Sequence, residues 1–398
     1  MGRLKLFLAW LLEPAYVWLV AYMGRQGLIL YANTELTISK ITNEALMVLE
    51  NSLTFTRCVN REYDDQYAVV GAKIGDTVNV RRPIRVIGTT GPNLNVEDFN
   101  ETSIPVVLTD QFHTDTQFGT KELALNIDMF SDRVLKPQIA AIANRVDFRG
   151  TTTAANGIAN IVGTPGTKPT GLITYLTAAA FLDSEGTPRD GERACVIEPF
   201  TSAVIIDSLK GLFMPQDKIG EQFKKGLMGR DSGGMDWYND QNIVSHTFGY
   251  ATGATTVTVN GANQGLATGW AATSTISINN SANNIFLNVG DTLQLAGAFA
   301  VNPQNRQAYG SNQLRNFVIT AATSQSGAGN FNITVSPAII YGGQFQNVSA
   351  APTASGAVTF LSLPTTGATG AVVSPQNLVF HRNCLTLAVA DLELPEGV

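Results

Sequence analysis

The chain of 398 residues is long enough for two or three domains with a sizeable core, yet only 15% of its residues are charged, below the usual quarter. Its formal net charge of −6 at neutral pH leaves no basic footprint and excludes strong nucleic-acid binding through a cationic surface. Few charges with many small and polar residues predict a protein that meets other protein over much of its surface.

Cysteine and histidine spacing predicts neither a metal site nor a disulfide. Cys58, Cys195 and Cys384 lie far apart and form no CxxC pattern, so buried free thiols are expected. The histidines form no metal-ligand pattern and are expected to be structural: His113, His246 and His381. The sequence shows no pairing of a nucleophile with a base and no paired-carboxylate motif. It therefore predicts a protein that is not an enzyme and needs no cofactor.

Residues 1–31 differ from the rest of the chain. Two apolar runs, FLAWLL and YVWLVAYM, are separated by Glu13 and Pro14. Each run is shorter than the ~20 residues that a membrane span needs, and the residues after the second make a poor signal-peptide cleavage site. A signal peptide, a short membrane anchor and an upstream extension of the coding frame remain open. We favour an extraneous or hydrophobic N-terminal extension, with the natural protein beginning near Ala32.

Residues 32–83 are expected to form an N-terminal arm and the start of the body, because helical spacing of apolar residues gives way to strand-like alternation. The sequence Arg81-Arg82-Pro83 interrupts the strand pattern, since proline cannot donate to a strand ladder. Residues 84–120 hold a turn-rich stretch and then a second strand pattern. Together these patterns predict a long hairpin that projects from the body and grips neighbours.

Residues 121–246 contain the best-specified helix, predicted over 128–149. Asp128 is its expected N-cap and Gly150 its expected stop. Pro137 is expected to kink it, because proline removes one helical hydrogen bond. The apolar positions share one face and are predicted to be its core side: Phe130, Val134, Leu135, Ile139, Ile142 and Val146.

Four arginines are candidate assembly contacts. Arg81 and Arg82 lie at the start of the predicted hairpin, while Arg133 and Arg145 lie mostly off the apolar face of the predicted helix. Arg133 and Arg145 either belong to a solvated charged face or touch a partner chain.

Composition changes abruptly after residue 246. Between 247 and 379 the only charged residues are Asp291, Arg306 and Arg315, and apolar residues alternate with polar ones in short runs split by Gly, Asn and Ser. This pattern predicts an all-β module, a small barrel or sandwich. An inserted domain of this kind needs its two ends close together, because both join the same body.

Several whole strings carry a family resemblance. They are ANTELTISKITNEAL, GDTVNVRRPIRV, FGTKELALNIDMFSDRVLKPQIAAIANRVD, VGTPGTKPTG, IGEQFKKGLMGRDSGGMDWYNDQNIVSHTFG and LVFHRNCLTLAVADLELPEGV. Through these strings, in this order over residues 32–398, the chain resembles the P22-type major coat proteins of tailed double-stranded DNA bacteriophages. None of the strings is a catalytic motif.

The resemblance implies an α+β chain with the HK97-like capsid fold, which has a long spine helix, an extended loop, an N-terminal arm and, in P22-type members, an inserted all-β barrel domain. The mapping it implies is the arm over 33–60, the extended loop over 84–120, peripheral and axial domains over 121–246 with the spine helix at 128–149, the insertion over 247–379, and a C-terminally truncated return to the body over 380–398.

The function implied by the resemblance is that of a major capsid protein, which self-assembles as hexamers and pentamers into an icosahedral shell. Scaffolding and portal proteins are expected partners, and double-stranded DNA is expected to be enclosed without sequence-specific binding. The protein is expected in the virion, with no membrane in the mature particle, after synthesis in the bacterial host cytoplasm. A secreted or surface-anchored β-rich adhesin is the alternative, suggested by residues 1–31 and by the Asn/Thr/Gly-rich module.

Overall fold

A computed structural model describes ten stretches of the chain: 53–61, 77–93, 96–97, 101–114, 135–209, 233–252, 256–281, 284–309, 312–361 and 371–389. The chain divides into two compact units, Met1–Leu53 with Phe112–Asn144, and Thr54–Gln111 with Arg145–Val398. All the described strands and the helices α6 and α7 belong to the second unit. Their mixture confirms the predicted α+β class.

A three-stranded sheet in the order β16-β3-β4 forms the centre of the body. Strand β3 (Arg193–Ile197) is buried along its whole length, pairs antiparallel with β16 (Leu378–His381) and runs parallel to β4 (Asp236–Asn239). Because side chains alternate along a strand, its residues enter two cores. Ala194 and Val196 pack with Phe55 and Phe380, whereas Cys195 and Ile197 pack with Tyr175 and Ile205.

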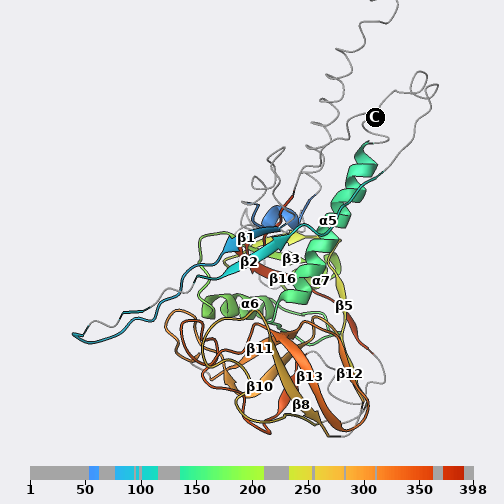
Figure 1. The fold of residues 1–398 in the computed structure, drawn as a ribbon. Coiled ribbons are helices and arrows are strands. Elements are labelled where there is room, and N and C mark those ends of the chain that lie inside the picture. Colours follow the sequence, from blue (N-terminus) through green and yellow to red (C-terminus); the bar gives the residue numbers. More distant parts are fainter. Residues whose placement is uncertain are drawn as a thin grey trace, which may run out of the picture. The chain divides into compact units, whose positions relative to one another are not determined.

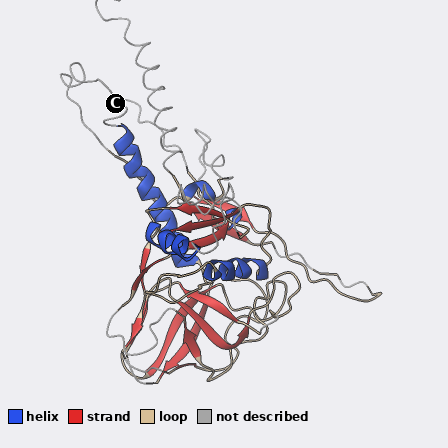
Figure 2. Cartoon of the chain, turned by 180° about the vertical axis from the view of Figure 1, so that it is seen from behind, coloured by secondary structure: helices blue, strands red, loops and turns tan. Residues whose placement is uncertain are grey.

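Helices α6 (Ile173–Ser184) and α7 (Pro199–Leu209) cover the second of these cores. Tyr175 of α6 packs against Trp237 of β4 with ring centroids 5.1 Å apart. Both views place α6 between the three-stranded sheet and the β-rich part of the chain (Figures 1 and 2). None of the helices within the described stretches combines the length and the apolar character needed to cross a membrane.

Helix α5 (Lys136–Gly157) buries a face of mainly small and polar residues. The buried positions recur every three or four residues, as one helical face requires: Ile139, Ala143, Asp147, Thr151 and Ala154. The predicted stop at Gly150 is wrong, because the helix continues to Gly157. Gly150 instead permits close packing, since a Cβ at this position would lie 2.7 Å from Cε1 of the buried Phe55 ring.

The predicted beginning of this helix, including its N-cap Asp128, lies outside the described residues. Pro137 falls in the first turn of the described helix, a position that proline tolerates because the first N–H groups have no helical partner. The kink expected at Pro137 therefore stays a prediction.

The β-rich part of the chain between residues 250 and 361 has its own apolar core. A six-stranded sheet has the order β14-β10-β11-β13-β8-β7, and a three-stranded sheet has the order β12-β9-β6. One buried cluster of Val, Ile, Leu, Ala and Phe side chains joins strands of both sheets. The strands are β6 (Tyr250–Ala251), β7 (Val257–Val259), β8 (Ser274–Asn280), β9 (Ile285–Leu287), β10 (Thr292–Phe299), β11 (Leu314–Ile319), β12 (Thr323–Gln325), β13 (Gly329–Ser336) and β14 (Val358–Phe360).

The two ends of this part are hydrogen-bonded to each other. Strand β5 (Ser245–Thr247) pairs antiparallel with β15 (Val373–Pro375), with Val373 opposite Thr247 and Pro375 opposite Ser245. The segments that lead into and out of the β-rich part, β5 and β15, therefore lie side by side.

Candidate functional site: the hairpin and its supports

The hairpin begins with a regular pair of strands. Strand β1 (Thr77–Arg81) pairs antiparallel with β2 (Ser103–Val107), from Thr77 opposite Val107 to Arg81 opposite Ser103 (Figure 1). One further bond, from the Arg82 N–H to the Thr102 carbonyl oxygen at 2.8 Å, extends the pairing. The proline at position 83 then ends it, as the sequence pattern indicates.

Apolar side chains stand exposed along this hairpin. They belong to β2 and to the connection between the two strands, and their exposed fractions are Ile84 44%, Val86 55%, Val96 79%, Ile104 45% and Val107 44%. Exposed large apolar residues scattered singly are ordinary, but a series on one element marks a surface that binds other protein. The hairpin therefore fits the predicted contact with neighbours.

The base of the hairpin contacts the β-rich part of the same chain. The Arg82 guanidinium lies over the Trp270 ring, 4.8 Å from its centroid. Nη2 of Arg306 donates to the carbonyl oxygen of Val86 at 2.9 Å. Arg81 points elsewhere: it is exposed and lies 4.0 Å from Glu101, an ion pair that contributes little because water screens it.

Helix α5 is joined to distant segments by buried polar groups. The Asp147 carboxylate, which is 1% exposed, accepts hydrogen bonds from the backbone N–H groups of Thr54 and Thr56, each at 3.0 Å. One turn later, the Thr151 hydroxyl donates to the Asn242 carbonyl oxygen at 2.9 Å. An exposed ion pair at 2.6 Å links Arg149 to Asp110, which follows β2.

The residues predicted for the helix face are only partly described. Ile139 is buried, while Leu135, Ile142 and Val146 are half-buried; Phe130 and Val134 lie outside the described residues. Sequence reasoning missed the polar members of the face, Asp147 and Thr151. Asp147 follows Ala143 by four residues and Thr151 follows Asp147 by four, a spacing that could have revealed them, but a search for apolar periodicity passes over polar residues.

The predicted assembly arginines have different environments. Arg145 is exposed on α5, Arg81 is exposed on β1, and Arg82 is half-buried under its contact with Trp270. Arg133 lies outside the described residues.

An ion-pair network fixes the end of α6. Asp183 accepts hydrogen bonds from Arg189 and pairs with Arg193, whose buried guanidinium also donates to the carbonyl oxygens of Thr187 and Pro188. The hydrogen bond from Arg189, together with the Arg193 charge, lowers the pKa of Asp183 to about 2. Because Arg193 begins β3, this network joins α6 to the central sheet.

Asp291, which directly precedes β10, is a fully buried carboxylate of the β-rich part. It accepts from the Gly249 N–H at 3.1 Å and the Asn288 N–H at 2.7 Å, and it lies 3.3 Å from Nε2 of His246. Gly249 is required there, since a Cβ would lie 2.2 Å from the Phe286 carbonyl oxygen. Buried charge is tolerated only with such partners. The network of Asp291 therefore has a structural role, because it ties the β-rich part to His246 of β5.

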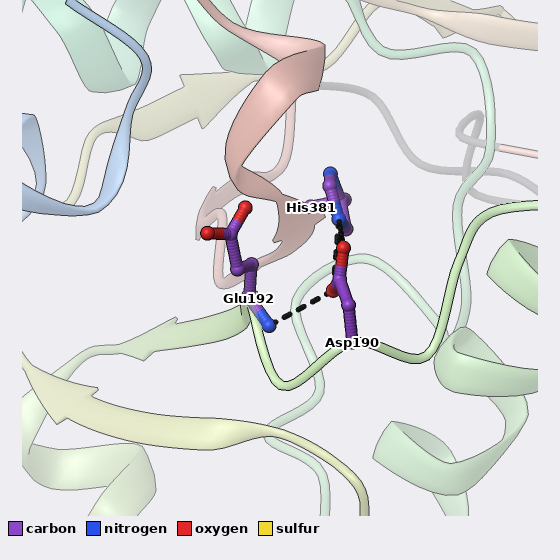
Figure 3. Close-up of side chains that lie close together, drawn as sticks. All are labelled: Asp190, Glu192 and His381. Atoms are coloured by element: carbon purple, nitrogen blue, oxygen red, sulfur yellow. Dashed lines mark hydrogen bonds and ion pairs between the residues drawn. The ribbon is translucent and has the colours of Figure 1, made fainter.

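Among the described residues, Asp190, Glu192 and His381 form the one group with the spacing of metal ligands (Figure 3). Nδ1 of His381 accepts from the Asn383 N–H at 3.2 Å, so the proton of the neutral ring lies on Nε2 and is donated to Asp190 at 3.1 Å. The Glu192 backbone N–H also donates to Asp190. Both ring nitrogens of His381 are thus engaged in hydrogen bonds within the protein, and the geometry indicates a structural link between β16 and the loop before β3.

The thiols are poor nucleophiles. Burial raises the pKa of Cys58 to about 11 and that of the fully buried Cys195 well above its usual value. Cys384 is exposed, so the expectation of buried thiols is wrong for this residue, although desolvation still raises its pKa to about 11. A thiol with such a pKa stays protonated at neutral pH and reacts slowly.

A cavity of about 240 Å³ lies between the end of α5, α6 and β16. Among the described residues that line it, only Tyr175 and Cys384 titrate, and burial raises both pKa values. The cavity therefore offers no acid or base for catalysis near neutral pH.

Comparison with known proteins gives one strong match. A family model described as P22 coat protein, gene protein 5, matches residues 32–397. No curated protein matches. A solved chain from Mycobacterium phage Che8 aligns over 81% of this chain and 90% of its own length, with 13% identity and a TM-score of 0.37, a likeness too low to carry an argument.

An exposed apolar hairpin, weakly nucleophilic thiols and buried polar links between segments are the features of a structural protein that meets other protein chains. The family model covers nearly the whole chain, so the chain belongs to the P22 coat protein family. It is a phage major capsid protein: copies of it assemble with one another, and its place is the capsid of the virion.

Proposed function

We propose that copies of this chain assemble as hexamers and pentamers into an icosahedral shell that encloses phage double-stranded DNA without sequence-specific contacts. Scaffolding and portal proteins are the proposed partners, the host cytoplasm is the proposed site of synthesis, and the mature virion has no membrane. The match to the P22 coat protein family over residues 32–397 carries this proposal. Nothing in the comparisons supports the adhesin alternative.

We further propose the HK97-like arrangement for this chain. Helix α5 is then the described part of the spine, residues 84–120 are the extended loop, and residues 247–379 are an inserted β-barrel domain. The pairing of β5 with β15 supports the insertion, because it brings both ends of the segment together. The separate apolar core of the β-rich part supports it further.

Assembly through the hairpin follows from its exposed apolar residues. Burying such side chains against a neighbour removes apolar surface from water, at about 25 cal/mol per Å². Arg81, Arg82, Arg133 and Arg145 are proposed to orient these contacts, since charged groups at an interface steer docking more than they add affinity. Individually modest contacts let misplaced subunits leave.

Electron microscopy of the purified protein, with and without a candidate scaffolding protein, tests the proposal. Shells are expected, and dispersed monomers under both conditions would contradict it. Val96→Asp in the hairpin is expected to lower the yield of shells about tenfold or more, because it places a charge in an apolar contact. Val373→Asp in β15 is the matched control, since this valine is also exposed (58%) but lies outside the hairpin.

A further inference from the structure

Four arginines gather where the hairpin base meets the β-rich part. Arg82 and Arg85 come from the hairpin, and Arg306 and Arg315 come from the β-rich part; we call these four residues the arginine cluster. The bond from Arg306 to the Val86 carbonyl oxygen brings the two segments together although they are 220 residues apart in the chain. Arg82 is fixed beside them by its contact with Trp270.

The positive charge of this cluster is poorly balanced. Glu185 pairs with Arg315, with 3.2 Å between Nη1 and Oε1. Arg306 donates only to carbonyl oxygens, those of Val86 and Gln344. Among the described residues, Arg82, Arg85 and Arg306 form no ion pair with a carboxylate, although the charge of Glu185 also acts on Arg85.

Two donors in the cluster are also unused. Nε of Arg306 and Nε of Arg315 are buried and have no hydrogen-bond acceptor within the described part of the chain. A buried donor without an acceptor is costly, and a guanidinium is the donor for which carboxylate and phosphate oxygens are the best acceptors.

The electrostatic environment of Arg85 agrees with crowding of like charge. Burial lowers the pKa of its guanidinium, the nearby charges of Arg82 and Arg315 lower it further, and Glu185 opposes them in part. An anion at this place would relieve the repulsion, because it favours the charged form of every arginine around it.

We propose that the arginine cluster is a binding site for an oxyanion. The bound group is a phosphate or a carboxylate, which fits the fork of the guanidinium. Its source is either free phosphate or a carboxylate of a second copy of the chain. The second source is supplied by the hairpin itself, which carries Glu97, Glu101 and Asp110 but no Lys or Arg between Arg85 and Lys121.

The test measures the thermal unfolding of the full chain against inorganic phosphate, with chloride holding the ionic strength constant. For the wild type, the midpoint is expected to rise with phosphate, and above the dissociation constant to rise with the logarithm of its concentration, as binding to the folded state requires. Arg85→Gln and Arg306→Gln are each expected to weaken the apparent phosphate affinity about tenfold or more, since each removes charged donors.

Arg382→Gln is the matched control, because Arg382 makes an exposed pair with Glu192 and is not part of the cluster. It is expected to retain the wild-type response. An equal response of the wild type to phosphate and chloride, or equal losses in all three variants, would overturn the site. If Arg306→Gln does not fold by circular dichroism, Arg85→Gln alone decides, since it breaks no ion pair of the described residues.

Sedimentation velocity distinguishes free phosphate from a carboxylate of a second copy as the source of the bound group. This measurement rests on the proposed self-assembly. If a second copy supplies the carboxylate, Arg85→Gln weakens self-association and phosphate competes with it. If free phosphate is the ligand, Arg85→Gln weakens the phosphate response without changing self-association. Failure of the wild type to self-associate under any condition would count against the proposed function, whereas the phosphate titration would still decide the anion site.

Discussion

Asp147 shows how one side chain fixes the position of a helix. Its two oxygens accept hydrogen bonds from the backbone N–H groups of Thr54 and Thr56; Asp147 and Thr56 are buried and Thr54 is half-buried. For stability, the role of Asp147 as a hydrogen-bond acceptor matters more than its charge. A buried N–H without an acceptor has lost its bond to water and forms no bond within the protein to replace it.

Asp147→Ala is expected to lower the free energy of unfolding by about 3 kcal/mol, because it leaves two N–H groups without acceptors. Arg145→Ala, on the exposed side of the same helix, is expected to change it by less than about 0.5 kcal/mol. Urea unfolding of unassembled subunits measures both values. Equal effects of the two substitutions would mean that Asp147 is not a structural anchor.

The Asp183 network gives stability that depends on pH. The folded pKa of Asp183, about 2, lies below the usual value of 3.8, so its ion pairs stabilise the folded state above pH 3.8 and are lost as the pH falls toward 2. Discounting for solvent screening, the contribution is roughly 1–2 kcal/mol.

The Asp183→Asn variant is therefore expected to be less stable than the wild type by about that amount at pH 7, and the difference in free energy of unfolding is expected to narrow between pH 4 and pH 2. Urea midpoints across this range check the sign, and a difference independent of pH would refute the assignment.

At the scale of elements, two glycines of α5 have different roles. Gly150 lies against Phe55, whereas a Cβ at Gly157, the last residue of the helix, would meet nothing within 4 Å. Helix propensity favours alanine at both sites by up to about 1 kcal/mol. Packing decides at Gly150, because the Phe55 ring is 2% exposed and has little room to move.

Gly150→Ala is expected to destabilise the protein by about 1–3 kcal/mol through overpacking. Gly157→Ala is expected to be neutral or to stabilise it by up to about 1 kcal/mol. Differential scanning calorimetry of the two variants compares them under the same conditions. A stabilising Gly150→Ala would show that the Phe55 ring can shift.

At the scale of the whole molecule, the β-rich part is the segment with the clearest independence. Its core cluster contains no residue of the central sheet. Several of its links to the body are polar, including the pair of Arg315 with Glu185 and the bond from Asn302 to the Ser184 carbonyl oxygen, while Arg82 of the hairpin lies over its Trp270 ring. Polar links of this kind break without exposing apolar surface.

Residues 245–381 expressed alone are expected to fold, because both sheets and their common core lie within this range. Proton-nitrogen NMR spectra are expected to show dispersed amide peaks with β-type shifts. A random-coil spectrum from soluble, intact protein would show that the segment needs the body to fold. With three charged residues between 247 and 379, the fragment is expected to be only marginally soluble.

The sequence by itself determined the features that depend on local order along the chain. Period and composition predicted the helix over 128–149 and marked the change at residue 247, and whole strings such as GDTVNVRRPIRV pointed to the family, whose resemblance implied the α+β class. These signals can be read without a structure because residues three or four apart in a helix, or two apart in a strand, share a face.

Only the tertiary structure decided which polar residues are buried and which distant segments meet. A sequence pattern assigns polar residues to the surface, but three of them are buried here: Asp147, Thr151 and Asp291. Each is buried because its hydrogen-bond partners come from distant parts of the chain. The sequence predicts Gly150 as a helix stop, whereas in the structure its missing side chain leaves room for the ring of Phe55. In the arginine cluster, the bond from Arg306 to the Val86 carbonyl oxygen joins positions 220 residues apart. No local spacing encodes such a contact, because it depends on the tertiary fold.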